Sequence, residues 1–277
     1  MTQTEATPHF TLSEENDANI ESAARAVIGA RRTMALTGAG LSVESGIPPF
    51  RGPGGLWTKY GEPPMDGYQR FLENPRKHWE EQRNPTQPWA LGLRETLTSA
   101  KPNAGHRAFA ELERLGHCSC VITQNVDDLH CQAGSQSLLE IHGNFYLLRC
   151  TQCHTRFRDG EIEIDPDRLP PLCVACGGII KGDTVQFGEP IPPDVLRRCY
   201  EEVDLADCML VAGTSATVFP AAQFPVEILR RGGCVIEVNP EPTDLTPATT
   251  HFLEGPAGAV LGRLLHHIAV LKEGASA

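Results

Sequence analysis

The amino-acid sequence predicts an α/β fold with a doubly wound parallel sheet and a second, smaller module. Short apolar runs alternate with segments of helical periodicity, and near-continuous apolar strands are typical of parallel sheets covered on both faces. Several of these runs end in glycine or polar residues, and open α/β sheets bind ligands at that end of their strands. Residues 149–181 interrupt the alternation with charges, prolines and four paired cysteines, which indicates an inserted module.

Each expected element has a local reason in the sequence. The first helix places apolar residues between Ile20 and Ile28 on one face, and a later helix stops at Gly116. The expected helices are 18–30, 66–83 (broken at Pro75), 103–115, 225–231 and 257–271. The expected strands are 33–37, 120–123, 138–141, 208–212 and 234–238.

Length and charge limit the classes of protein that fit. A chain of 277 residues exceeds the usual size of a single core, which favours one large domain plus a smaller one. The net charge of -11 argues against a nucleic-acid groove, which needs a basic stripe. No apolar run approaches the roughly 18 residues of a membrane span, so we expect no membrane partner.

The N-terminal segment and the cysteines predict the compartment. The first residues are polar and acidic without an apolar core, so we expect residues 1–17 to form a loose tail rather than a secretory signal. Ten cysteines without such a signal favour a reducing compartment, in which cysteines are metal ligands, catalysts or core residues. We therefore expect a cytoplasmic protein.

Four of the cysteines have the spacing of a zinc site. Cys150 and Cys153 form one C-x2-C pair, and Cys173 and Cys176 form a second pair nineteen residues later. Four thiolates complete a tetrahedron and leave no position for water or substrate. The sequence thus predicts one structural Zn²⁺ that holds a small module with little core of its own.

A glycine loop follows the first strand. Gly38-Ala39-Gly40 stands where a nucleotide-binding loop belongs, and Ser42 is placed to open a helix beneath a pyrophosphate. The strict G-x-G-x-x-G pattern fails because position 43 is Val43, and no acidic residue ends a second strand about twenty residues on. Taken alone, the loop fits either a nucleotide-binding site or a simple tight turn.

An ordered set of motifs extends along the chain. It comprises Gly38-Ala39-Gly40-Leu41-Ser42, Ser45-Gly46-Ile47-Pro48, Phe50-Arg51-Gly52, Thr123-Gln124-Asn125-Val126-Asp127-Asp128-Leu129-His130, His142-Gly143-Asn144, the cysteine quartet, Phe187-Gly188-Glu189, Gly213-Thr214-Ser215 and Val238-Asn239. In this order, over about residues 20–270, the set resembles the sirtuin family, the NAD-dependent protein-lysine deacylases. Each motif is moderately specific, whereas the ordered set is highly specific.

The resemblance implies a discontinuous architecture. A large Rossmann-like domain would contain residues 18–50, 101–148 and 182–272. Residues 51–100 would supply a lid loop and the helical part of a small domain, and residues 149–181 its zinc-ribbon module. The segment 40–57 would close over NAD, which gives a reason for its many glycine and proline breaks.

The resemblance also implies a reaction and its residues. NAD would be consumed as a co-substrate, so that an acylated lysine yields free lysine, nicotinamide and O-acyl-ADP-ribose. His142 matches the family's base, and a neutral imidazole titrates in a suitable range; Asn125 and Asp127 complete the catalytic set. The implied NAD-binding residues are Gly38, Ala39, Gly40, Ser42, Phe50, Arg51, Trp57, Gln124, Asn125, Asp127, Gly213, Thr214, Ser215, Asn239 and Ala257. The implied peptide-binding residues are Val185, Phe187, Gly188 and Glu189, beside which an acylated lysine peptide would add as a strand.

Two positions depart from the family's patterns. Pro49 stands where the commonest lid carries aspartate, so we expect retained activity with altered handling of nicotinamide. The Tyr-x-x-Arg pair of the branch that removes succinyl groups is absent, because neither Tyr60 nor Tyr68 is followed by arginine at the third position. We therefore expect acetyl or longer neutral acyl groups to be preferred over succinyl.

The expected function is NAD-dependent protein-lysine deacylation by a monomer. The alternative is a protein mono-ADP-ribosyltransferase that uses the same NAD site and differs in its product. A non-catalytic binding module fits less well, because a binder needs no base such as His142.

Overall fold

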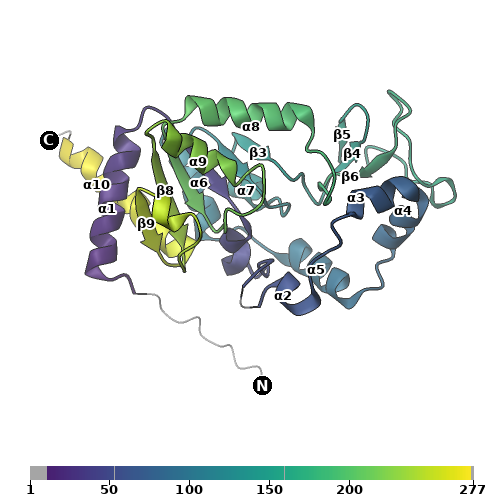
Figure 1. Ribbon diagram of the computed structural model, residues 1–277, viewed down its shortest axis with the longest axis horizontal. Helices are drawn as coiled ribbons and strands as arrows, with labels where there is room; N and C mark the ends of the chain where they lie inside the picture. The colour runs from purple at the N-terminus through teal and green to yellow at the C-terminus, as the bar shows by residue number, and fades with distance from the viewer. Residues whose placement is uncertain (1–10, 53, 159, 276–277) are drawn as a thin grey trace, which may run out of the picture.

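The computed structural model describes residues 11–52, 54–158 and 160–275, and its main feature is a six-stranded parallel sheet (Figure 1). The strands are β1 (Thr33–Thr37), β2 (Val121–Thr123), β3 (Leu138–Glu140), β7 (Cys208–Ala212), β8 (Cys234–Asn239) and β9 (His251–Glu254). Their order is β3-β2-β1-β7-β8-β9. The chain therefore adds β2 and β3 on one side of β1, and then β7, β8 and β9 on the other side. The predicted doubly wound sheet is confirmed, with its topological switch point between β1 and β7.

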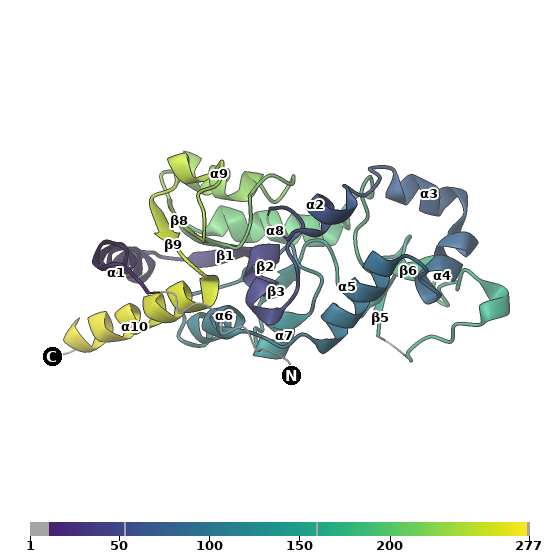
Figure 2. The ribbon, with the colours of Figure 1, turned by 90° about the horizontal axis from the view of Figure 1, so that it is seen from below.

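Helices cover both faces of this sheet (Figures 1 and 2). One face packs against α1 (Glu14–Gly29), α6 (Ala104–Arg114) and α10 (Ala257–Ala275), and the other against α8 (Pro193–Leu205) and α9 (Gln223–Arg230). Strand β1 shows why its three central residues are apolar: Met34 and Leu36 enter the second core, while Ala35 enters the first. The interior of a strand buried on both faces favours apolar side chains at successive positions.

The first helix begins earlier than the sequence pattern predicts. Ser13 caps α1 by accepting a hydrogen bond from the backbone N–H of Asn16 at 3.1 Å, so residues 14–17 are helical rather than part of the tail. Residues 1–10 of the predicted tail lie outside the described residues. The expected break at Pro75 is confirmed, because α3 (Gly67–Glu73) ends before it and α4 (Pro75–Arg83) begins on it.

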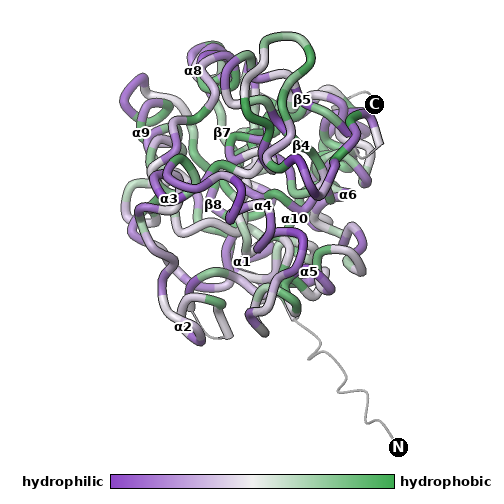
Figure 3. Tube along the Cα trace, turned by 90° about the vertical axis from the view of Figure 1, so that its right-hand side faces the viewer, coloured by the Kyte–Doolittle hydropathy of each residue, from purple (hydrophilic) through white to green (hydrophobic). Residues whose placement is uncertain are grey.

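A second, antiparallel sheet forms in the interrupting segment. It has the order β5-β4-β6 and contains β4 (Leu148–Cys150), β5 (Arg156–Phe157) and β6 (Ile180–Gly182). Figure 2 shows α3, α4 and α5 (Pro88–Ser99) on the same side of the molecule. The chain of α4 is mostly hydrophilic (Figure 3), and its one buried residue, Trp79, donates from Nε1 to the carbonyl of Ile180 at 2.8 Å.

Shorter elements complete the chain. They are the 3-10 helices η1 (Ala39–Ser45), η2 (Pro166–Arg168) and η3 (Thr246–Ala248), and the helices α2 (Leu56–Tyr60) and α7 (Leu129–Ala133). Ser42 therefore lies inside a 3-10 helix that begins at Ala39, which corrects the expectation that Ser42 opens a helix. The predicted domain boundaries stay a prediction. Among the described residues, none of the helices is both long enough and apolar enough to cross a bilayer.

Candidate active site

The predicted site residues follow five neighbouring strands. Gly38 follows β1, Gln124 follows β2, His142 follows β3 by one residue, Gly213 follows β7, and Asn239 ends β8. These strands are adjacent and parallel, so their carboxyl ends form one edge of the sheet. The fold thus brings together motifs that lie up to two hundred residues apart in the sequence.

The loops after β1 and β7 are in backbone contact. The N–H of Gly40 donates to the carbonyl of Gly213 at 2.7 Å. A Cβ on Gly40 would lie 2.8 Å from the Gly213 Cα, and a Cβ on Gly213, whose φ is +63°, would lie 2.1 Å from the Leu41 nitrogen. Both glycines are therefore required by close approach, and they leave bare backbone at the switch point, where a phosphate could approach.

Ser42 joins two of the predicted catalytic residues. Its hydroxyl donates to Asp127 Oδ2 at 2.6 Å and accepts from Asn125 Nδ2 at 3.1 Å. Asn125 Nδ2 also donates to the carbonyl of Gly38 at 3.0 Å. All three side chains are buried. Burial raises the pKa of Asp127, and the Ser42 hydroxyl opposes that shift by stabilising the carboxylate.

Two buried histidines lie beside this cluster, and the sequence analysis assigned no chemistry to them. His130 Nε2 is 3.0 Å from the Thr37 hydroxyl, and the rings of His130 and His106 stack edge to face at 5.0 Å. Burial lowers the pKa of His106 to about 4 and of His130 to about 3, so both are neutral at pH 7. Their positions in the sequence gave no signal, because a lone histidine is ordinarily a structural residue.

His142 is oriented by the backbone of the neighbouring strand. Its Nδ1 lies 3.1 Å from the carbonyl of Gln124, and since a carbonyl only accepts, Nδ1 carries the proton. The neutral ring then has an unprotonated Nε2, which makes no hydrogen bond with the described residues. Burial lowers the pKa of His142, while the bond to Gln124 opposes the shift. The imidazole is thus a neutral base at pH 7.

The opposite side of the switch point is also ordered by hydrogen bonds. Gln124 Nε2 donates to Thr214 Oγ1 at 2.9 Å. Asn239 Nδ2 donates to the carbonyl of Thr214 at 3.1 Å and to Glu237 Oε1 at 2.9 Å. Ser215 is exposed, and Ala257 is buried at the first position of α10. Glu237 is fully buried, and the sequence analysis missed it.

Two residues of the predicted lid, Phe50 and Trp57, form a row of aromatic rings with Phe187. Trp57 lies between Phe50 and Phe187, with ring centroids 5.2 Å and 5.7 Å away. The Arg51 guanidinium covers the Trp57 ring at 4.5 Å and donates to the Thr217 hydroxyl at 3.1 Å. The lid is therefore in contact both with the loop after β7 and with the segment predicted to bind peptide.

A buried ion network lies behind the predicted peptide segment; it comprises Arg149, Lys181, Asp183 and Glu189. Arg149 pairs with Asp183 at 2.9 Å and with Glu189 at 2.8 Å, and Lys181 pairs with Glu189 at 2.9 Å. The side chain of Glu189 is therefore engaged in ion pairs, which leaves its main chain available for the predicted peptide strand. Gly188 is exposed, with φ +81°.

The same network is joined to the loop that carries His142. The carboxylate of Asp183 accepts from the Asn144 N–H at 2.9 Å, and the Val185 N–H donates to the carbonyl of His142 at 2.8 Å. The predicted peptide segment and His142 are therefore held by the same short stretch of chain.

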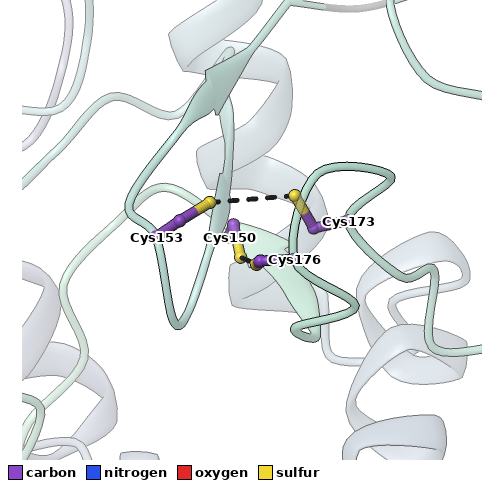
Figure 4. Close-up of side chains that lie close together, drawn as sticks. All are labelled: Cys150, Cys153, Cys173 and Cys176. Atoms are coloured by element: carbon purple, nitrogen blue, oxygen red, sulfur yellow. Dashed lines mark hydrogen bonds between the residues drawn. The ribbon is translucent and has the colours of Figure 1, made fainter.

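The four paired cysteines converge in the second sheet and its loops (Figure 4). Their sulfurs all lie within 4.8 Å of one another, with Cys150–Cys176 at 3.4 Å and Cys153–Cys173 at 3.8 Å. Tetrahedral zinc with bonds of about 2.3 Å separates its sulfurs by roughly 3.8 Å. The cluster is therefore compatible with one structural zinc ion.

The hydrogen-bonding groups at the carboxyl edge of the large sheet fit a dinucleotide. Asn125 and Asn239 each use their amide N–H groups internally, so within the described residues their Oδ1 atoms remain open as acceptors for ligand hydroxyls. The glycine-lined switch point supplies close access to the backbone, as an NAD pyrophosphate requires.

Comparisons with known proteins agree with this geometry. The model of the Sir2 family matches residues 38–220. An NAD-dependent protein deacylase 1 of Archaeoglobus fulgidus is 47% identical over 85% of this chain and 92% of its own length. A solved Sir2 homologue–NAD complex is 44% identical with a TM-score of 0.73, covering 91% of this chain and 94% of its own. A Sir2 complex with deacetylated p53 peptide and 3′-O-acetyl ADP-ribose is 31% identical with a TM-score of 0.72, covering 89% and 97%.

Proposed function

The chain belongs to the Sir2 family and is an NAD-dependent protein deacylase, and we propose that His142 is the base of its reaction. The observation that carries this proposal is the hydrogen bond from His142 Nδ1 to the carbonyl of Gln124. It selects the tautomer with a free Nε2, which is the atom that must accept a proton. Burial lowers the pKa of His142, which favours the unprotonated form of that atom at pH 7.

We propose that the sheet edge holds NAD across the switch point. When bound, NAD supplies an activated ribose carbon with nicotinamide as its leaving group. Asn125 and Asp127, connected through Ser42, would orient the ribose and the nicotinamide carboxamide. The bare backbone at Gly38, Ala39 and Gly40 would face the phosphates. The adenosine side would be bound by Gly213, Thr214, Ser215, Asn239 and Ala257.

We propose that the lid excludes water from the reacting carbon. Phe50 and Trp57 already pack together, and Trp57 reaches Phe187. Arg51 links this aromatic row to the loop after β7 by donating a hydrogen bond to the Thr217 hydroxyl. Exclusion of water favours transfer to the acyl group over hydrolysis of NAD.

We propose that an acylated lysine peptide adds as a strand along residues 185–189. The deacetylated peptide and acetylated ADP-ribose of the related complex support this substrate class. The two buried cations of this region, Arg149 and Lys181, are already paired with acidic side chains. An acidic acyl group would therefore find no free buried cation in the network, and neutral acyl groups are preferred over succinyl.

We propose a monomeric cytoplasmic enzyme without nucleic-acid or membrane partners. The net charge of -11 and the ten cysteines, all free among the described residues, support this proposal. Sedimentation at micromolar concentration tests the oligomeric state.

Mass spectrometry of the products tests the reaction. Purified enzyme is given NAD and peptides carrying acetyl-, butyryl-, myristoyl- or succinyl-lysine, with His142→Ala and the exposed His266→Ala as a matched pair. We expect O-acyl-ADP-ribose and free lysine, at least a hundredfold slower formation in His142→Ala, and unchanged formation in His266→Ala. ADP-ribose attached to protein, without loss of acyl groups, would instead establish the transferase. A succinyl preference would overturn the proposed acyl specificity.

A further inference from the structure

Two cysteines outside the zinc cluster lie side by side in the large sheet. Cys208 is the first residue of β7 and Cys234 the first residue of β8, and the two are direct partners in the parallel register. Both side chains belong to the core face covered by α1 and α10. Neighbouring strands are about 4.8 Å apart, which falls within the Cα separations that disulfides span.

The two thiols differ in exposure and acidity. Cys208 is fully buried, whereas Cys234 is partly exposed. The parallel register makes the two side chains neighbours on the same face of the sheet. The neighbouring thiol lowers the pKa of Cys234, while the pKa of Cys208 is raised by the same neighbour and by burial. Cys234 therefore has the character of an attacking thiolate, and Cys208 that of its resolving partner.

We propose that Cys208 and Cys234 form a reversible oxidation site that takes hydrogen peroxide as its oxidant. The Cys234 thiolate attacks one peroxide oxygen; an S–O bond forms, the O–O bond breaks, and the leaving hydroxide is protonated to water. The Cys208 thiol then attacks the Cys234 sulfur; an S–S bond forms, the S–O bond breaks, and a second water leaves with the thiol proton. The two thiols lose two electrons, which reduce the peroxide. A dithiol restores the pair.

The position of the pair separates this chemistry from the deacylase site. Cys208 and Cys234 occupy the amino ends of their strands, while Gly213 and Asn239 lie at the carboxyl ends. The disulfide would close a loop that contains α9 and would tie β7 to β8. We therefore expect the oxidised enzyme to retain its deacylase activity.

Peptide mapping of the full-length, zinc-loaded protein tests the proposal. The protein is titrated with hydrogen peroxide, alkylated, and digested with trypsin and a glutamate-specific protease. Cleavage after Glu202 separates Cys208 from Cys199, which lies in the core of the opposite face. We expect a peptide pair linked through Cys208 and Cys234, 2 Da lighter than the two reduced peptides together, that appears before zinc is released and disappears with dithiothreitol.

Three variants decide the assignment. Cys234→Ser should abolish the linked pair. Cys208→Ala should leave Cys234 as a sulfenic acid that dimedone labels. Cys131→Ser removes an exposed cysteine outside the zinc cluster and should leave the link intact. The proposal is overturned if Cys131 is oxidised while no Cys208–Cys234 link forms, or if the link forms only in unfolded protein.

Discussion

The two parts of the molecule are stabilised in different ways. The large sheet is buried between two extensive apolar layers, and strands β1 and β7 are buried at every position. The small module has one modest cluster, formed by Trp79, Cys150, Leu169, Cys173 and Ile180. Two of these residues belong to the cysteine quartet, and two cations of the charged network, Arg149 and Lys181, adjoin Cys150 and Ile180 in the chain. Apolar burial suffices for the first part, whereas the second depends on thiolates and ion pairs.

This contrast has a consequence for function. The large sheet presents the proposed NAD-binding edge, but the proposed peptide segment and the His142 loop are held by Asp183 and Val185, which follow β6 of the small module. Damage to the module should therefore stop deacylation while the large sheet stays folded. Each prediction below tests this separation.

Removal of zinc should have the largest effect. Chelation, or Cys173→Ser, deprives the module of most of its folding free energy, so we expect deacylase activity to fall at least a hundredfold. Far-UV circular dichroism should keep most of its helical signal, because α1, α6, α8 and α10 belong to the large part. Cys131→Ser is the matched control and should change neither. Cooperative loss of all helices on chelation would contradict the separation.

Asp183→Asn should have the next largest effect. It removes one of the two carboxylates that pair with Arg149 in a buried site, and removal of one partner of such a pair costs about 3–5 kcal/mol. Urea unfolding measures this change, and because Asp183 also anchors Asn144, kcat should fall as well. The exposed pair Arg76–Glu80 provides the control: Glu80→Gln should cost about 0.5 kcal/mol or less. Equal costs at the two pairs would show that burial of the network is unimportant.

Acidification should lower the free energy of unfolding by a smaller amount, through two buried histidines in the large part of the molecule. The pKa values of His106 and His130 are lowered to about 4 and about 3, whereas the unfolded chain has ordinary values near 6.5. Below pH 6.5 the unfolded state binds more protons, so stability is lost as the pH falls toward 4. At pH 5 each histidine should cost about 2 kcal/mol relative to pH 7.

Urea unfolding of His106→Asn at both pH values isolates this effect. We expect the variant to lose about 2 kcal/mol less than the parent chain between pH 7 and pH 5. An identical loss in the variant would show that other groups cause the acid sensitivity. The pH dependence of activity tests His142 instead. Because the pKa of His142 is lowered from 6.5, we expect the acid-side fall of kcat to lie below pH 6.5.

Local patterns predicted the elements that carry strong periodicity or capping signals. The strands 33–37 and 208–212 were expected with the bounds that the structure has, and the break at Pro75 was also expected. Helices α5 and α8 and strand β9 were missed. Helix α5 begins at Pro88, beside a proline-rich stretch that resembles a loop, and β9 gains its pairing only from β8. Where tertiary pairing decides an element, its own sequence carries a weak signal.

The sequence by itself determined the apolar strands, the cysteine quartet and the motifs that resemble the sirtuin family. These signals are local: each depends on residue type and on spacing within a short stretch of chain. Three contacts were decided only by the tertiary structure. Ser42 joins Asn125 to Asp127 through hydrogen bonds. Glu189 forms ion pairs with Arg149 and Lys181, and Cys208 is the register partner of Cys234. Each of these contacts joins residues brought together by strand order and sheet register, which short-range spacing does not encode.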